Sequence, residues 1–283
     1  MNIMGKESEK EEKDLVISIV TYGTSAETLA KLIAYMGLGH LKSSYDFLIV
    51  DNMGSNDVKE YCLENSYNYT YPGKNLGFGA GHNVASRYFN AAYKVHLILN
   101  PDVFISPQTI DKVVAYIKDN EAVSLVSPRL LNEDGSIQNI CRFLPTVQGL
   151  AVRFLTKFFA VGVDRLEDKF NLTTKPIVVP AIHGACFFVK ERDFLDVGGF
   201  DEDYFLYVED IDLCRQLGNL GSIVYLPVCT AMHTHAQGSY KSLKLFLYHL
   251  RSFVVYFRKW GVFIDTEGKR INKSAISVEI SKT

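Results

Sequence analysis

The sequence predicts an α/β fold, in which a mostly parallel central sheet is flanked by helices and followed by a C-terminal helical extension. Between residues 14 and 129, short apolar runs rich in β-branched residues alternate with stretches of helical periodicity. That alternation is typical of a Rossmann-like sheet with helices on its faces. The 283 residues are 47% hydrophobic and 22% charged, which indicates a folded globular chain and excludes a disordered, collagen-like or coiled-coil protein.

Short runs of apolar and β-branched residues in the first half of the chain predict strands. The predicted strands cover residues 15–21, 47–50, 67–71, 96–99 and 124–126. Helices are predicted between them, over 28–36 and 110–117, because apolar residues recur there at helical spacing. Residues 132–135 (Asn-Glu-Asp-Gly) then predict a hairpin turn, after which the alternation stops. The first half is therefore interpreted as a nucleotide-binding layer.

The second half has a less regular pattern. It predicts, in order, an aromatic-rich helix over 150–159, a mobile loop over 163–175, a strand over 182–189, a turn over 197–200, a helix over 209–217 and a strand over 223–226. A last helix over 242–260 carries an apolar stripe, and residues 241–260 hold five Lys or Arg, six aromatic residues and no Asp or Glu. Either this helix packs its stripe on the domain, or it touches a membrane surface.

Charge and cysteine content exclude several classes of protein. The net charge of −2 leaves no general basic field, so the sequence predicts no nucleic-acid partner. Five scattered cysteines without CxxC spacing argue against a disulfide framework and predict a reducing, cytoplasmic location. Residues 6–14 are charged and resemble no secretory signal, and no run of 18 apolar residues predicts a membrane span. Peripheral contact with the inner face of the cytoplasmic membrane is left open.

Polar residues follow three of the predicted strands. Asp51 and Asn52 end the strand over 47–50, where a carboxylate could accept from a base or a ribose, or could simply form a capped turn. The glycine-rich residues 75–83 open a helix, whose N–H groups favour a phosphate, although glycines can also serve tight packing. Asp102 follows the strand over 96–99 and suits a divalent metal on a diphosphate, or an ordinary turn.

The densest acidic stretch covers residues 201–212. Glu209 and Asp210 lie at a predicted helix start, where one carboxylate could act as a general base or merely stabilise the helix. Asp201 and Asp212 are interpreted as capping or surface residues.

Taken in order, these residues resemble family 2 inverting glycosyltransferases of GT-A fold, and in particular the bacterial rhamnosyltransferases of O-antigen and cell-wall polysaccharide synthesis. The resemblance covers about residues 15 to 260. It is carried by residues 19–22 (Ile-Val-Thr-Tyr), 51–52 (Asp-Asn), 75–79 (Asn-Leu-Gly-Phe-Gly), 100–102 (Asn-Pro-Asp), 184–187 (Gly-Ala-Cys-Phe), 198–201 (Gly-Gly-Phe-Asp) and 207–214 (Tyr-Val-Glu-Asp-Ile-Asp-Leu-Cys).

The resemblance implies a role for each matching residue. Asp210 would be the catalytic base, with Glu209 as the second candidate. Asp102 and His233 would bind Mg²⁺ or Mn²⁺, with His235 as an alternative to His233. The nucleotide-sugar site would hold Thr21, Tyr22, Asp51, Asn52, Asn75, Gly77, Asn83, Asn100 and Arg142. Asn100 replaces the first aspartate of an Asp-x-Asp motif, so the metal would bind to fewer charges.

The implied activity is transfer of a sugar from a dTDP- or UDP-sugar to a glycan, with rhamnose from dTDP-rhamnose favoured and a lipid-linked acceptor expected. The implied organisation is a charged tail over 1–14, a glycosyltransferase domain over 15–240, a basic aromatic helix over 241–262 and a tail over 263–283. Within the domain, residues 15–129 would bind the donor and residues 130–240 the acceptor. A homodimer is left open. The alternatives are an inactive nucleotide-sugar-binding protein and a dinucleotide-dependent oxidoreductase.

Overall fold

The computed structural model describes residues 12–89, 91–147, 149, 166–234, 243–262 and 264–280. The strands are β1 (Glu12–Thr21), β2 (Tyr45–Asp51), β3 (Asn68–Thr70), β4 (Ala92–Leu99), β5 (Val103–Phe104), β6 (Val123–Leu131), β7 (Cys141–Arg142), β8 (Ile177–Val178), β9 (Ala181–Ile182), β10 (Cys186–Lys190) and β11 (Ser222–His233). The helices are α1 (Ala26–Met36), a 3₁₀ turn η1 (Leu38–His40), α2 (Asn56–Glu64), α3 (Phe78–Tyr88), α4 (Pro107–Asp119), α6 (Leu166–Leu172), α7 (Glu191–Asp196), α8 (Glu209–Leu217), α9 (Leu243–Trp260) and α10 (Thr266–Ile280).

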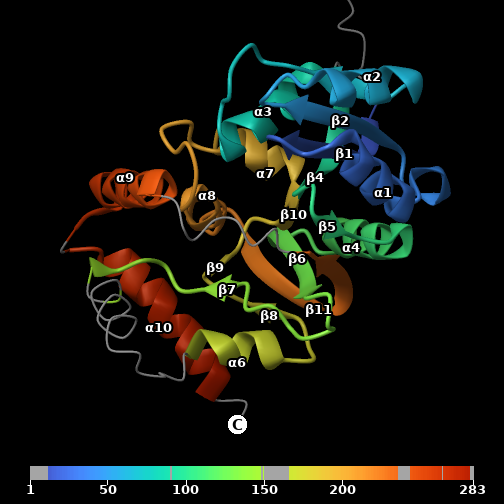
Figure 1. Ribbon diagram of the computed structural model, residues 1–283. Coiled ribbons are helices and arrows are strands. Elements are labelled where there is room, and N and C mark those ends of the chain that lie inside the picture. Colours follow the sequence, from blue (N-terminus) through green and yellow to red (C-terminus); the bar gives the residue numbers. More distant parts are fainter. Residues whose placement is uncertain are drawn as a thin grey trace, which may run out of the picture.

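A nine-stranded sheet runs through the described residues in the order β3-β2-β1-β4-β10-β6-β11-β5, with β8 paired to β11 (Figure 1). The first four strands are parallel, as the sequence predicted, whereas β10 is antiparallel to both β4 and β6. The chain builds β1, β2 and β3 outward and then returns to place β4 on the other side of β1. The carboxyl ends of β1 and β4 therefore lie at a topological switch point, where open α/β sheets bind ligands.

Strand β1 is buried on both faces, which explains its continuous apolar sequence. Leu15, Ile17 and Ile19 belong to the large core that α1 and α4 cover. Val16 and Val20 face the other way and form a smaller core with Ala85 of α3. Side chains alternate between the two faces of a strand, so one strand holds two helical layers together.

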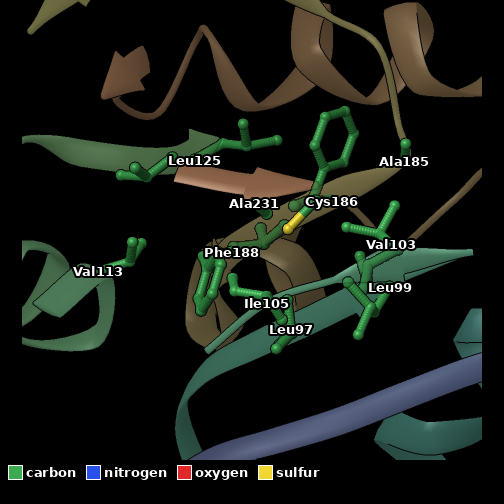
Figure 2. Close-up of a cluster of buried hydrophobic side chains, with 14 of the residues drawn as sticks. Leu97, Leu99, Val103, Ile105, Val113, Leu125, Ala185, Cys186, Phe188 and Ala231 are labelled. Atoms are coloured by element: carbon green, nitrogen blue, oxygen red, sulfur yellow. The ribbon is translucent and has the colours of Figure 1, made fainter. Parts of the chain in front are cut away.

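The second half of the sheet is held by a shared apolar cluster (Figure 2). Cys186 and Phe188 of β10 pack between side chains of β4, β5, β6 and α4, and the labelled neighbours include Leu97, Val103 and Leu125. All five cysteines of the chain are buried free thiols, in agreement with the absence of a disulfide framework.

Most of the predicted elements are confirmed. The structure has strands where the sequence predicted them over 15–21, 47–50, 67–71, 96–99, 124–126 and 223–226, and these are β1, β2, β3, β4, β6 and β11. It also has helices where the sequence predicted them over 28–36, 110–117, 209–217 and 242–260, and these are α1, α4, α8 and α9. The hairpin turn over 132–135 is present, with the Gly135 N–H donating to the Asn132 carbonyl at 2.9 Å. The helix predicted over 150–159 lies outside the described residues.

Two predictions of local structure were wrong. The strand predicted over 182–189 is divided into β9 and β10 by a turn, because the backbone N–H of Gly184 turns to donate to the Asp210 carboxylate. The loop predicted over 163–175 contains helix α6. Asn171 of α6 is fully buried, and its side-chain oxygen accepts from the backbone N–H groups of Ile140 and Cys141, which polar composition did not reveal.

The C-terminal helix α9 packs only part of its predicted stripe on the domain, through Phe253 and Phe257, which contact the cluster of Tyr204, Val208 and Tyr256. Leu243, Leu247 and Leu250 are exposed, whereas Ser252 and Tyr256, from another side of the helix, are buried. No described helix is both long enough and apolar enough to cross a membrane.

The close approach of α3 to β1 predicts an effect of a single methyl group. A Cβ added at Gly81 would lie 2.9 Å from two methyl carbons of Val20, so Gly81→Ala should lower the free energy of unfolding by about 1–3 kcal/mol. Urea denaturation measures this change. Gly39→Ala is the control, because no atom lies within 4 Å of its added carbon. Equal stability of the two variants would contradict the tight packing of α3.

Candidate active site

The turn after β2 is organised around Asp51. Its carboxylate accepts from the backbone N–H of Met53 at 2.9 Å and of Ser55 at 2.6 Å, and from the hydroxyls of Thr21 and Tyr69 at 3.3 and 3.2 Å. Asp51 is buried, and these donors use the positions at which it would accept from a base. The carboxylate therefore shapes the edge of the sheet and can meet a nucleoside only by sharing one of these bonds. Tyr22, next to Thr21, is 65% exposed at the same edge.

The glycine-rich loop is fixed to the same edge by amide side chains. Asn52 donates to the Gly77 carbonyl at 2.8 Å and accepts from the Leu76 N–H at 3.3 Å, and Asn75 accepts from the Gly77 N–H at 2.8 Å. Gly77 has a φ of +87°, and an added Cβ would lie 2.1 Å from the Phe205 carbonyl oxygen. Only glycine fits this close approach between two loops.

Asn83 holds a different pair of segments together. Its side chain donates to the Phe200 carbonyl at 2.8 Å and accepts from the Phe200 N–H at 2.9 Å. Asn83 is buried and also donates to Glu202 Oε1 at 3.1 Å, so it is an internal brace between α3 and residues 200–202.

Asp102 and His233 are brought together by the sheet. β5 pairs with β11 so that His233 lies opposite Val103, and the Thr234 N–H donates to the Asp102 carbonyl at 2.9 Å. As a result, Asp102 Oδ1 lies 3.3 Å from His233 Nε2. Asp102 Oδ1 is buried and accepts no hydrogen bond from the residues that the structure describes, which is the arrangement expected where a cation would sit. His235 lies outside the described residues.

Gln138 fixes the proton of the His233 ring. Gln138 Nε2 donates to the His233 backbone carbonyl at 2.9 Å and to Asn132 Oδ1 at 2.7 Å, so Gln138 Oε1 must face His233 Nδ1 at 2.9 Å. Because an amide oxygen can only accept, Nδ1 carries the proton. In the neutral ring, Nε2 therefore points a lone pair towards Asp102, the state in which imidazole binds a metal.

Two protein ligands suit a metal that substrate oxygens complete. Among the residues that the structure describes, no group of three or more His, Cys, Asp or Glu side chains is arranged to hold a metal. Mg²⁺ is often bound by one or two carboxylates together with substrate phosphates, and Mn²⁺ also accepts imidazole. The Asp102–His233 pair fits a divalent cation of this kind.

Glu209 and Asp210 begin helix α8 but differ in environment. Glu209 is buried, and its Oε2 has no hydrogen-bond partner in the described structure. Burial, reinforced by the Asp210 charge, raises the pKa of Glu209 to about 8. Asp210 is half-buried, and its two oxygens accept from the backbone N–H groups of Gly184 at 3.0 Å and Ile211 at 2.8 Å. Asp210 is therefore the more accessible of the two carboxylates.

The turn over 183–185 joins these groups. The Gly184 N–H binds Asp210, and the Ala185 carbonyl accepts from the Asn100 N–H at 2.9 Å. The ring of His183 lies 6.5 Å from the ring of His233, measured between centroids. The turn thus places β4, α8 and β11 around one point. The sequence did not reveal His183 and Gln138, because neither belongs to a motif. Each is recognised only by its position beside His233.

Two further predictions concern Arg142 and Asp212. Arg142 is half-buried on β7, where its Nη1 donates to the Cys141 carbonyl at 2.8 Å. The interpretation of Asp212 as a capping or surface residue was wrong, because Asp212 is fully buried and binds Lys259 and Trp260 of α9.

A second polar cluster lies beneath the sheet edge. Ser18 Oγ lies 2.6 Å from His82 Nδ1 and 2.7 Å from His96 Nε2, and Glu191 Oε2 lies 3.3 Å from His96 Nδ1. All four side chains are buried, and burial lowers the pKa of His82 well below its ordinary value. The order resembles that of a hydrolase triad, but substrate cannot reach the Ser18 hydroxyl, so the cluster braces β1, α3, β4 and α7.

Comparison with curated proteins identifies glycosyltransferases. Hexosyltransferase Agl10 of low-salt glycan biosynthesis in Haloferax volcanii is 30% identical over 203 residues, 71% of this chain and 60% of that protein. Rhamnosyltransferase WbbL of Escherichia coli K12 is 27% identical over 237 residues, 81% of this chain and 88% of WbbL. The N-acetylglucosaminyl-diphospho-decaprenol L-rhamnosyltransferase of Mycobacterium tuberculosis is 30% identical over 169 residues, 56% of this chain and 53% of that protein. No family model matches the chain.

Solved structures share the fold at low sequence identity. The mannosyltransferase PcManGT from Pyrobaculum calidifontis, in complex with GDP-Man and Mn²⁺, has a TM-score of 0.60 at 13% identity over 97% of this chain and 76% of its own. GalNAc-T7 with UDP, GalNAc and Mn²⁺ has a TM-score of 0.62 at 15% identity over 88% of this chain and 48% of its own. The chain therefore has the GT-A fold, and its named relatives are rhamnosyltransferases and hexosyltransferases, as the sequence resemblance implied.

Proposed function

We propose that the chain is an inverting glycosyltransferase that moves a sugar from a nucleoside diphosphate to a glycan. The observation that carries this proposal is the pairing of Asp210, held by the Gly184 N–H, with the Asp102–His233 pair at the same edge of the sheet. The names of the relatives favour rhamnose as the sugar, and the name of the mycobacterial relative favours a lipid-linked acceptor. The choice of dTDP-rhamnose as the donor follows from the sequence resemblance. The Mn²⁺ bound to PcManGT and GalNAc-T7 supports Mg²⁺ or Mn²⁺ as the metal.

The residues divide the chemistry between them. Asp210 takes the proton of an acceptor hydroxyl as its oxygen bonds to the anomeric carbon, and the bond from that carbon to the diphosphate breaks with its electron pair. A single displacement of this kind inverts the anomeric centre. The departing nucleoside diphosphate gains negative charge, and Asp102 and His233 would hold a divalent cation whose charge would offset it. Thr21, Tyr22, Asp51, Asn52, Asn75 and Gly77 form the edge on which the nucleoside lies, with Asn100 and Arg142 towards the diphosphate and Asn83 bracing the pocket.

Asp210 is preferred to Glu209 as the base. The raised pKa keeps Glu209 largely protonated at neutral pH, and a protonated carboxyl cannot accept the acceptor proton. Burial also keeps Glu209 from a substrate hydroxyl. Glu209 is instead a neutral neighbour of the Asp210 carboxylate.

The first prediction tests the base. Asp210→Asn should reduce transfer from dTDP-rhamnose by about 10²–10⁴-fold, because the amide cannot take a proton. Binding of dTDP with Mn²⁺, measured by titration calorimetry, should stay within about twofold, since the base faces the acceptor. Unchanged turnover would place the base elsewhere, and tight binding of NADH without metal would contradict a transferase.

The second prediction tests the protonation of Glu209. The folded state holds its proton up to about pH 8, whereas the unfolded chain releases it near the ordinary pKa of 4.5. Between these values the folded state binds more protons, so this carboxyl lowers the free energy of unfolding as pH rises. Urea denaturation of Glu209→Gln at pH 6 and pH 9 should show a smaller fall with pH than the parent chain. Parallel pH dependences would exclude the raised pKa.

The third prediction tests the orientation of His233. Gln138→Leu removes the acceptor for Nδ1–H and should weaken Mn²⁺ binding to the nucleotide complex about 10–100-fold. Binding of dTDP without metal should not change. Asp102→Ala should weaken metal binding at least as much, and Gln108→Leu, the same substitution at an exposed position of α4, should have no effect. Normal Mn²⁺ affinity in Gln138→Leu would refute the role of Gln138, and ring nitrogen shifts of His233 measured by NMR report the tautomer directly.

A further inference from the structure

Helix α9 presents an apolar stripe to the outside of the protein. Its exposed apolar side chains are Leu243, Phe246, Leu247, Leu250 and Val254, with exposed fractions between 52% and 74%. They recur at intervals of three and four residues and therefore share one face of the helix. Figure 1 shows α9 at the edge of the molecule, beside α8.

The helix cannot turn this stripe inward, because other side chains fix its rotation. Trp260 Nε1 donates to Asp212 Oδ1 at 2.6 Å, and Lys259 Nζ binds Asp212 Oδ2 at 2.9 Å. The hydroxyl of Ser252 donates to the Leu206 carbonyl at 2.8 Å, and the buried Tyr256 hydroxyl accepts from Arg215 at 3.0 Å. A rotation of α9 would remove Lys259 and Trp260 from the buried Asp212 carboxylate and leave its charge without the lysine that pairs with it, which is strongly unfavourable.

A row of positive charge runs beside the stripe. Lys244, Arg251 and Arg258 are exposed and stand seven residues apart, so they line up along the helix. On an ideal helical wheel this row lies next to the face of Leu247 and Val254. Helix α9 contains no Asp or Glu. A broad apolar face with basic residues at its border is the pattern of helices that lie in a membrane interface.

We propose that this face of α9 docks on a bilayer surface that contains anionic lipids. The apolar stripe enters the boundary between headgroups and acyl chains, while Lys244, Arg251 and Arg258 lie among the phosphates. A second copy of the chain is a poorer partner, because its α9 would bring the same cations and no acidic residue to pair with them.

The docking also orients the candidate active site. Asp212, which anchors α9, stands on the first turns of α8 two residues after Asp210. The base therefore keeps a fixed position relative to the docked helix, as transfer to a lipid-linked acceptor requires. This last link rests on the proposed function, whereas the docking itself does not.

Vesicle flotation tests the surface. The full chain should bind vesicles of phosphatidylglycerol and phosphatidylcholine and should bind phosphatidylcholine alone far more weakly. Lys244→Gln, Arg251→Gln and Arg258→Gln should each weaken binding about fivefold, the effect of one basic residue at an anionic surface. The double variant Leu247→Glu/Leu250→Glu should lose binding altogether.

The matched control is the double variant Lys59→Gln/Leu63→Glu on α2, where the same kinds of residue are also exposed. It should bind vesicles as the parent chain does. No binding of the parent chain, or equal binding by Leu247→Glu/Leu250→Glu, would overturn the proposal. The proposal would also be overturned if the parent chain were a dimer in sedimentation and Leu247→Glu/Leu250→Glu converted it to a monomer that still bound vesicles.

Activity measurements separate this proposal from the proposed function. Transfer to a water-soluble acceptor should be the same in Leu247→Glu/Leu250→Glu and in the parent chain, because the stripe does not touch the site. Vesicle binding without transfer to any acceptor would overturn the proposed function and leave the membrane surface standing. Transfer to a soluble acceptor without vesicle binding would overturn the membrane surface and leave the proposed function standing.

Discussion

The arrangement of the site depends on one hydrogen bond, from the Gly184 N–H to the Asp210 carboxylate. A Cβ at Gly184 would lie 2.9 Å from the Cβ of Asp210, so the bond requires a glycine. The same turn binds Asn100 through the Ala185 carbonyl, and its first residue, His183, donates from its N–H to the Ile140 carbonyl at 2.8 Å. Breaking β9 from β10 at this turn is therefore what joins the end of β4 to helix α8, on which Asp210 stands.

Backbone strain precedes the same carboxylate. Tyr207 and Val208 both have a φ of +71°, a conformation that is rare for residues other than glycine and unusual for a β-branched one. Strain of this kind, about 1–3 kcal/mol for each residue, persists only where the surroundings impose it. Here Val208 is buried with Tyr204 and Tyr256, and the Asp212 N–H binds the Val208 carbonyl at 2.9 Å. Packing against α9 thus maintains the turn from which Glu209 and Asp210 begin helix α8.

Sequence patterns predicted the parts of the fold that local chemistry decides. Strand β1 follows from a continuous apolar run, and helices α1 and α4 follow from periodicity. Asp102 and Asp210 were candidates for the site because each follows or opens a regular element. Gln138 and His183 could not be found in this way, since their importance comes from a pairing with His233, which is distant along the chain. Asp212 was misassigned for the same reason: its partners Lys259 and Trp260 lie on a helix nearly fifty residues away. The position of Asp51 after a strand was predictable from the sequence. The four groups that donate hydrogen bonds to its carboxylate were not.

The connection between α8 and α9 suggests why a buried charge is retained in this fold. Asp212 receives hydrogen bonds from Tyr204, Gln216, Lys259 and Trp260, and the Arg215 guanidinium beside it stacks 4.1 Å from the Trp260 ring and binds Asp265. A buried ionic cluster of this kind adds little stability compared with apolar packing, but it is highly specific in geometry. An apolar contact would let α9 rotate or slide on α8. Fixed partners allow only one rotation, the one that keeps the apolar stripe outward while Asp210 stays at the end of the sheet.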